Sequence, residues 1–289
     1  MSPDRSLDTM AHLRSAIAGI EAHVGPDRSR AFFRLPVARA LDGALSGGLA
    51  GDALHEIAPA GPGDGAAAMA FALCLAARFC AASPHRASAL IAYEEFCARE
   101  TGALYGPGLA AFGLKREQLV FVNAQDGRAL LWAMEEALKS GALAVVVGEL
   151  WSVAKHYGLA ASRRLLLAAR AGATPALMVH GGVFGQADGL SSAAETRFEI
   201  AAAASRRLAP AGGRLSLPGA PAFAARLVKA RLSARLSPSA HGPPTRLFDE
   251  TRVMRLEWRG VETSFHDPTV PLPAVGSPIE RSRARLAGE

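Results

Sequence analysis

The sequence has few cysteines, few aromatic residues and no long uninterrupted apolar run. Three cysteines, Cys74, Cys80 and Cys97, are too few and too scattered for a disulfide framework or a zinc site, so we expect them to be buried. Aromatic residues make up only 6% of the chain, so the core must be built mainly from alanine, leucine and valine. No apolar run reaches the roughly 18 residues of a membrane-spanning helix, and residues 1–6 lack the apolar segment of a signal peptide. These absences predict a cytoplasmic protein with no membrane partner.

The bulk properties that are present suit a globular protein. The chain has 289 residues, enough for one large domain or one domain with extensions, and 50% of them are hydrophobic. The net charge of +6 permits contact with an acidic partner such as nucleic acid. It does not require one, because the richness in alanine, arginine and glycine is typical of genomes that encode many basic proteins.

Apolar segments of strand length alternate with segments of helical period through the first two thirds of the chain. We expect strands at 53–57, 87–93, 119–122, 143–147 and 176–180, and helices at 66–82, after Glu94, at 127–141 and at 158–171. This alternation predicts an α/β fold with a mostly parallel sheet flanked by helices. The uninterrupted apolar run at 143–147 is typical of a strand in the middle of such a sheet.

The pattern changes after about Gly185. Residues 196–204, 222–232 and 252–258 read as successive strands without helices between them, which predicts an antiparallel C-terminal extension of the sheet.

We therefore divide the chain into three parts. Residues 1–36 contain an amphipathic helix at 7–24 and a linker, and residues 37–265 form the core domain. Residues 266–289, rich in proline, serine and arginine, are expected to be disordered.

A glycine-rich segment follows the first expected strand. Gly61, Gly63 and Gly65 lie between that strand and an alanine-rich helix, the layout of a nucleotide-binding loop. A functional loop of this kind reads G-x-x-x-x-G-K-[ST], in which the lysine neutralises phosphates and the hydroxyl holds magnesium. Here Ala66 and Ala67 stand where the lysine and the hydroxyl residue belong. The segment has the layout of an ATPase loop without its chemistry.

Several segments in this order resemble a known family. They are R-A-L-D-G-A-L-S-G-G-L-A-G-D-A-L-H-E-I (39–57), A-L-I-A-Y-E-E-F (89–96), L-Y-G-P-G-L-A-A-F-G-L (104–114), L-W-A-M-E-E-A-L (131–138) and G-L-A-A-S-R-R-L (158–165). Together they resemble the RecA recombinase core and, more closely, the RecA-like inducible-mutagenesis protein A family (ImuA), with the cell-division inhibitor SulA as a more distant relative. The resemblance covers roughly residues 37–260 and implies a RecA-like fold of the P-loop NTPase type.

Other parts of the ATPase machinery also depart from the pattern that the resemblance implies. The acidic residue expected at the end of strand 143–147 appears as Gly148 followed by Glu149, and one step along a strand turns a side chain to the other face. The pair that senses the nucleotide state in RecA falls at His180 and Gly181. We therefore expect no catalysis and no cofactor.

Some positions of the nucleotide site remain recognisable. The glycines of the turn could still present backbone N–H groups to an anion, although Asp64 within the turn opposes this. Glu95, with its neighbour Glu94, matches the catalytic glutamate, and either could orient a water molecule. Tyr105 lies near the residue that stacks on adenine in RecA, or alternatively caps its loop against the sheet edge.

The resemblance also indicates candidate DNA-binding positions. Lys155, His156, Arg163 and Arg164 fall where RecA faces DNA, and their charges suit phosphate contacts; the alternative is a solvated helix face. Residues 185–195 match the second DNA-binding loop, are flexible by composition and carry no positive charge.

The three tryptophans have different expected environments. Trp151 falls at the mouth of the vestigial nucleotide site, where it is either an interface residue or part of the core. Trp132 is expected in the core, and Trp258 is expected to pack on the sheet.

The function implied by the resemblance is that of a non-catalytic accessory protein in error-prone translesion DNA synthesis during the bacterial DNA-damage (SOS) response. The implied partners are a family-Y polymerase-like protein (ImuB) and an error-prone polymerase III α-type subunit; RecA and DNA are further candidates. Two alternatives stay open: an atypical ATP-dependent enzyme whose missing cation comes from Lys115 or Arg116, and a SulA-like inhibitor of a tubulin-like division protein. Arg281, Arg283 and Arg285 in the tail could dock a partner.

Overall fold

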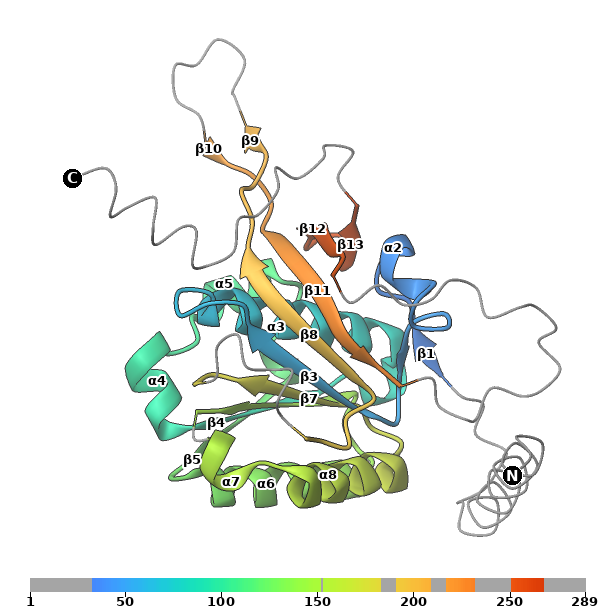
Figure 1. Ribbon diagram of the computed structural model, residues 1–289, viewed down its shortest axis with the longest axis vertical. Coiled ribbons are helices and arrows are strands. Elements are labelled where there is room, and N and C mark those ends of the chain that lie inside the picture. The colour runs from blue at the N-terminus through green and yellow to red at the C-terminus, as the bar shows by residue number, and fades with distance from the viewer. Residues whose placement is uncertain (1–32, 152, 183–190, 209–216, 232–250, 268–289) are drawn as a thin grey trace, which may run out of the picture.

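The computed structural model describes five stretches of the chain (Figure 1). They are residues 33–151, 153–182, 191–208, 217–231 and 251–267. The helix expected at 7–24, residues 185–190 of the expected second DNA-binding loop and the tail from 268 lie outside these stretches.

A single curved sheet organises the described residues. From one edge to the other its strands are β13 (Ser264–His266), β12 (Val253–Arg259), β11 (Ala222–Ala230), β8 (Thr196–Ala202), β3 (Leu54–Pro59), β7 (Ala176–His180), β6 (Val145–Leu150), β4 (Ala89–Glu94) and β5 (Leu119–Ala124). Strands β8 to β5 are parallel to one another, whereas β11, β12 and β13 pair antiparallel. The predicted class, α/β with a mostly parallel sheet and an antiparallel extension, is confirmed. The extension begins one strand later than expected, because β8 still pairs parallel with β3.

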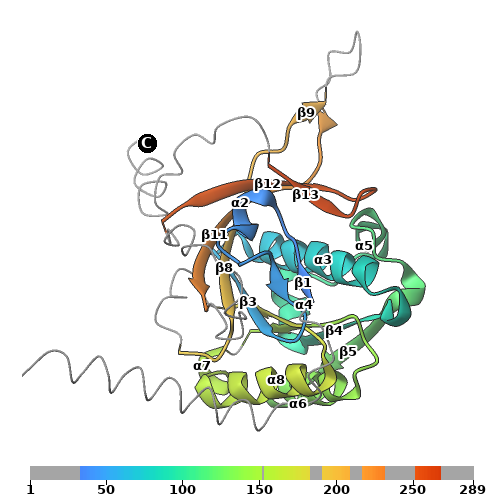
Figure 2. The same ribbon diagram turned by 90° about the vertical axis from the view of Figure 1, so that its right-hand side faces the viewer.

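Helices cover both faces of the sheet. Helix α3 (Gly65–Ala82) lies on one face, and α6 (Gly127–Ser140) and α8 (Leu159–Gly172) lie side by side on the other (Figure 2). The shorter elements are β1 (Arg34–Leu35), α2 (Arg39–Asp42), β2 (Leu49–Ala50), η1 (Pro84–Arg86), α4 (Glu95–Thr101), α5 (Gly106–Ala111), η2 (Arg116–Gln118), α7 (Val153–His156), β9 (Arg207–Leu208) and β10 (Leu217–Pro218).

Helix α3 is enclosed because the sheet bends around it (Figure 2). The Phe71 ring, in the middle of α3, lies 5.6 Å from the ring of Phe198 on β8, 5.6 Å from that of Phe223 on β11 and 5.1 Å from that of Phe265 on β13. A helix covered on nearly all sides can be apolar on nearly all sides. In length and composition α3 could therefore also cross a membrane, but most of it is buried in this core.

The opposite face is packed closely enough to require glycine. A Cβ atom at Gly172 of α8 would lie 1.8 Å from the carbonyl oxygen of Leu138 on α6, so the two helices meet where that side chain is missing. A Cβ at Gly148 of β6 would lie 2.1 Å from the Met134 sulfur. Trp132, which we expected in this core, is 63% exposed on the outer side of α6. That expectation was wrong because an amphipathic period fixes the buried face only to within one helical position.

The other burial expectations hold. Cys74, Cys80 and Cys97 are buried with free thiols, and Trp258 is 1% exposed and packs against the Phe265 ring. Leu35 of β1, ahead of the expected core domain, also belongs to the core on the α3 side.

Candidate functional site

The glycine-rich turn connects β3 to α3 at the edge where the parallel strands end, which we call the carboxyl edge (Figure 1). The turn is tied to the neighbouring strand, since Ala60 N donates to the Ile200 carbonyl at 2.8 Å. Within the turn, Asp64 N donates to the Gly61 carbonyl at 3.0 Å. The predicted layout of strand, glycine-rich turn and helix is therefore present. Gly63 has open space around it, as a phosphate-binding turn requires.

A carboxylate lies at the N-terminus of α3, beside the glycine-rich turn. Asp64 is the residue at the N-terminus of α3, and its Oδ1 accepts a hydrogen bond from Ala202 N of β8 at 3.0 Å. A Cβ at Gly61 would lie 3.3 Å from Asp64 Oδ2, so the carboxylate lies over the turn. Its negative charge compensates the positive end of the helix and repels an incoming phosphate. Among the described residues, no lysine or arginine pairs with Asp64.

Helix α4 covers part of the same turn. A Cβ at Gly65 would lie 3.6 Å from the Thr101 methyl group, at the last residue of α4. Tyr105 follows and is 73% exposed. The alternative that this ring caps its loop against the sheet edge is wrong, because the ring projects into solvent. Whether it stacks on a base stays a prediction.

The two adjacent glutamates after β4 are both engaged in the structure. Glu94 is buried, and its Oε2 accepts a hydrogen bond from Trp151 N at 2.9 Å. Glu95 forms an ion pair with Arg99 one turn along α4. Glu94 therefore fixes the backbone directly after β6, and Glu95 pairs with a residue of its own helix. The expectation that either carboxylate could orient a water molecule stays a prediction.

Glu149 lies on the same face of the sheet as α3. Val145 and Val147, two and four residues before it on β6, belong to the core on the α3 side, whereas Gly148 faces Met134 of α6. Our expectation that the one-residue offset turns Glu149 away from the loop was wrong, because Gly148 is the position that faces away. Burial raises the pKa of the Glu149 carboxyl to about 7. Among the described residues, no lysine or arginine forms an ion pair with this carboxyl group.

The two cations that we considered as substitutes lie at the wrong edge. Lys115 and Arg116 directly precede β5, and Leu119 at the start of β5 pairs with Ala89 at the start of β4. They therefore lie where the parallel strands begin, and the glycine-rich turn lies where the strands end. A strand of six residues separates these edges by about 20 Å.

A buried charged network lies on the other face of the sheet, beneath β3 and β8. Arg197 Nε donates to Glu56 Oε2 at 2.7 Å, and Tyr157 Oη donates to Glu56 Oε1 at 2.6 Å. Burial opposes ionisation of Glu56, but the interactions with His180 and Arg197 and the hydrogen bonds from Tyr157 and Ser192 outweigh it and hold its pKa below the ordinary value. The ion pair therefore persists without solvent and ties the two strands to the turn between α7 and α8.

His180, at the position of the RecA nucleotide sensor, borders this network. Its ring stands edge-on to Tyr157, with centroids 5.2 Å apart. Burial lowers the pKa of His180 to about 4, so the ring is neutral at pH 7. The network extends to Lys229 of β11, which donates to the Ser192 carbonyl at 2.8 Å. Residues 192–194 are buried, which corrects the expectation that the whole segment 185–195 is flexible by composition.

Sequence patterns gave no signal for this network. Glu56 and Arg197 are 141 residues apart, and the contact exists only because β3 and β8 are neighbours. The polar pair His55–Glu56 inside a buried strand is the sequence feature that could have indicated it.

The four candidate DNA-binding cations lie on α7 and α8. Lys155, Arg163 and Arg164 are exposed and His156 is partly buried, so they share one region of the surface without forming a cradle. Arg164 pairs with Glu135 of α6. A solvated helix face accounts for Arg164, and phosphate contact by the others stays a prediction.

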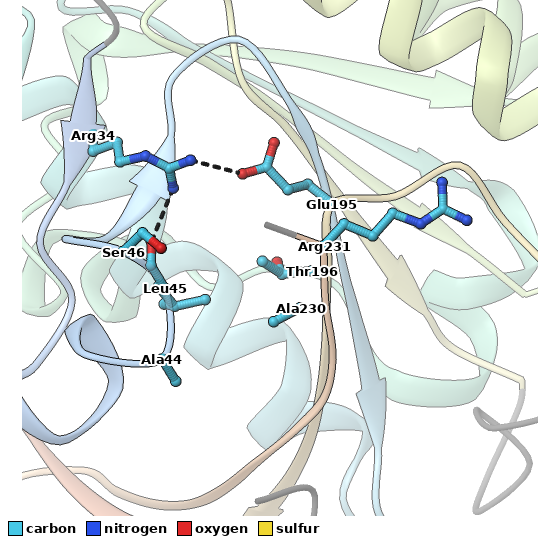
Figure 3. A pocket seen from close by; sticks show the side chains of 8 residues that line it. All are labelled: Arg34, Ala44, Leu45, Ser46, Glu195, Thr196, Ala230 and Arg231. Carbon is cyan, nitrogen blue, oxygen red and sulfur yellow. Dashed lines mark hydrogen bonds and ion pairs between the residues drawn. The ribbon is translucent and has the colours of Figure 1, made fainter. Parts of the chain in front are cut away.

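A small hollow lies at the opposite, amino edge of the sheet (Figure 3). Arg34 donates to the Leu45 carbonyl at 2.9 Å and pairs with Glu195 Oε1 at 3.3 Å. The hollow has a volume of about 10 Å³, the space of one water molecule. The Arg34 contacts attach the N-terminal strands to the sheet, and the hollow has no room for a nucleotide.

The chain is similar to SulA from Pseudomonas aeruginosa, with 25% sequence identity and a TM-score of 0.35 over 44% of this chain and 96% of that one. No protein-family model matches the chain, and no curated protein matches it.

We predict that Glu149 makes folding stability depend on pH. Between about pH 4.5, the ordinary value, and about pH 7, the folded chain binds a proton at Glu149 that the unfolded chain has released. The free energy of unfolding should therefore fall as the pH rises through this window. Glu149→Gln removes the effect and should be more stable than the parent at pH 8 by up to about 3 kcal/mol. Urea unfolding at pH 5 and pH 8 measures it, and the exposed Glu136→Gln variant should follow the parent.

A second prediction concerns the buried ion pair. Arg197→Met leaves the Glu56 carboxylate buried without its cation and should lower the free energy of unfolding by about 3–5 kcal/mol. Adding Glu56→Gln to that variant should recover much of the loss. Arg259→Met, which breaks the exposed pair with Glu262, should change stability little. Equal losses in Arg197→Met and Arg259→Met by urea unfolding would contradict the assignment.

Proposed function

We propose that this protein is a non-catalytic, RecA-like accessory protein that works as an adaptor in SOS-induced, error-prone translesion DNA synthesis in the bacterial cytoplasm. The observation that carries the non-catalytic part is the glycine-rich turn. It holds the Asp64 carboxylate over Gly61, and the helix after it begins with Ala66 and Ala67 in place of a lysine and a hydroxyl residue.

The physical reason is electrostatic. Phosphoryl transfer depends almost entirely on positioning and on compensating the phosphate charge. Loss of a single stabilising group of this kind lowers a rate by about 10²–10³-fold. Here the lysine and the magnesium ligand are both replaced, and a carboxylate adds repulsion. We therefore propose that this turn does not hydrolyse ATP.

The remaining fold is well suited to holding partners. The core on the α3 side and the Glu56–Arg197 pair keep the sheet and its edges rigid without any ligand. Aromatic side chains remain exposed at the carboxyl edge and on α6, including Phe96, Tyr105 and Trp132. Exposed aromatic residues of this kind favour protein interfaces. A rigid core with exposed aromatic edges supports an adaptor role.

The choice of pathway rests on the resemblance to the ImuA family. It implies as partners the family-Y polymerase-like ImuB and the error-prone polymerase III α-type subunit. The matching segments 104–114 and 131–138 contribute Leu109, Leu114, Met134 and Leu138 to the two cores. The resemblance thus supports a shared fold scaffold, and the partners follow from it as part of the proposal.

Isothermal calorimetry tests the non-catalytic part. We expect no magnesium-dependent binding when a non-hydrolysable ATP analogue is titrated into the full chain at micromolar concentrations. The reason is that Asp64 leaves the turn without a net positive field. Asp64→Asn provides the comparison: it removes the repulsion, and weak magnesium-independent binding gained in that variant would support the account. Clear micromolar binding by the parent would contradict it and favour the atypical enzyme.

Co-purification tests the adaptor part. We expect the tagged full chain, expressed with the two polymerase-type partners and a tubulin-like division protein, to retain a polymerase-type partner and to release the division protein. The expectation follows from the motif resemblance. Retention of the division protein alone would overturn the pathway assignment in favour of a SulA-like inhibitor. RecA belongs in the same experiment as a further candidate partner.

A further inference from the structure

Two aromatic rings form an open platform at the carboxyl edge of the sheet. Phe96 on α4 and Trp151, directly after β6, lie with ring centroids 5.6 Å apart and planes tilted by 59°. Phe96 is 43% exposed and Trp151 is partly exposed. Solvent therefore reaches the aromatic pair, which lies at the same edge of the sheet as the glycine-rich turn.

The platform is held in place from behind. A Cβ at Gly182 would lie 2.4 Å from the Trp151 carbonyl oxygen, and a Cβ at Gly181 would lie 3.1 Å from the indole atom Cε3. The backbone after β7 thus packs directly against Trp151. On the other side, the Glu94 carboxylate accepts the hydrogen bond from Trp151 N. The indole is fixed before any partner arrives, so binding on it costs little conformational entropy.

Negative charge lies next to this platform. Glu149 is two residues before Trp151 and is 6% exposed, and its carboxylate has no hydrogen bond or ion pair to another described residue. Glu149 and Glu94 both act electrostatically on Cys97, the residue after Phe96, and Glu94 Oε2 accepts the hydrogen bond from Trp151 N. A buried carboxylate without a partner is costly, and a bound cation would remove that cost.

The chain itself does not supply this cation from the nearest helix. Arg99 on α4 is paired with Glu95. A phosphate or nucleic acid is excluded by like charge, and no described group of three acidic, histidine or cysteine side chains could hold a metal ion. An aromatic face beside a carboxylate instead matches a guanidinium group, which stacks on a ring and pairs with a carboxylate at the same time.

We propose that the platform of Phe96 and Trp151, with the carboxylates of Glu149 and Glu94 beside it, is a docking site for an arginine side chain on a peptide segment of a partner protein. The inference rests on the proposed non-catalytic function. Carboxylates that attract a guanidinium would repel the phosphates of ATP at the same edge. It adds to that function by naming the chemical group, a guanidinium, through which a partner protein would bind the adaptor. In this proposal the carboxyl edge binds a cationic group, whereas a functional nucleotide site at this edge would bind anionic phosphates.

The probe is a blocked peptide, acetyl-Ala-Ala-Arg-Ala-Ala-amide, titrated into the full chain. The three tryptophan indole N–H signals are followed by NMR. We expect a saturable shift of the Trp151 signal, while the signals of Trp132 on α6 and of buried Trp258 stay in place. Trp151→Phe assigns the signal. Peptides with lysine or citrulline in place of arginine should bind about tenfold more weakly, because they lose the planar pairing or the charge.

Matched variants locate the site. Glu149→Gln should weaken arginine-peptide binding about tenfold, whereas Glu117→Gln, the same charge change on an exposed residue at the amino edge, should leave it unchanged. Phe96→Leu should weaken binding, and Phe121→Leu, at an equally exposed phenylalanine on β5, should not. The unshifted Trp258 signal verifies that each variant is folded.

Three results would overturn the proposal: no saturable Trp151 shift, equal binding of the citrulline or lysine peptide, or equal effects of Glu149→Gln and Glu117→Gln. If binding appears only after Arg281, Arg283 and Arg285 are replaced by alanine, the chain's own tail occupies the platform and the partner assignment is wrong. Calorimetry with the ATP analogue distinguishes failure of the proposed function from failure of this inference. Binding of the analogue would contradict the proposed function. If neither the analogue nor the arginine peptide binds, only this inference is wrong.

Discussion

The burial of α3 inside the curved sheet is the constraint on which the rest of this structure depends. Phe71 sits among the rings of three strands, β8, β11 and β13, which come from the last third of the chain. The helix can be apolar on nearly every side only because these strands close around it. Its N-terminus is thereby fixed against β8, and this fixes the turn that carries Asp64.

From that constraint follows the chemistry of the carboxyl edge. In a nucleotide-binding protein of this architecture, a lysine and a bound metal would supply positive charge where the strands end. Here the carboxyl groups of Asp64, Glu94 and Glu149 lie at the same edge, and each has a defined place in the fold. Apolar packing and the Glu56–Arg197 pair hold the strands together, and neither of them involves a ligand.

Strand and helix positions were largely predictable from the sequence, because hydrophobic period and length depend on neighbours along the chain. Strand β7 was predicted at its observed bounds, and α3 and α6 to within a residue at each end. The candidate site was less predictable. The face of Glu149, the exposure of Trp132 and Tyr105 and the distant edge of Lys115 depend on which strands are adjacent and in which direction they run. A step of one residue in register reverses such a conclusion.

The sequence by itself determined the fold class, the buried cysteines and the missing lysine of the glycine-rich turn, because composition and local period are properties of the chain. Only the tertiary structure decided that Glu56 pairs with Arg197 across 141 residues, that Asp64 lies over the turn, and that Phe96 and Trp151 meet at the carboxyl edge. These arrangements depend on which elements are adjacent in space and on burial, and both exist only after the sheet has assembled.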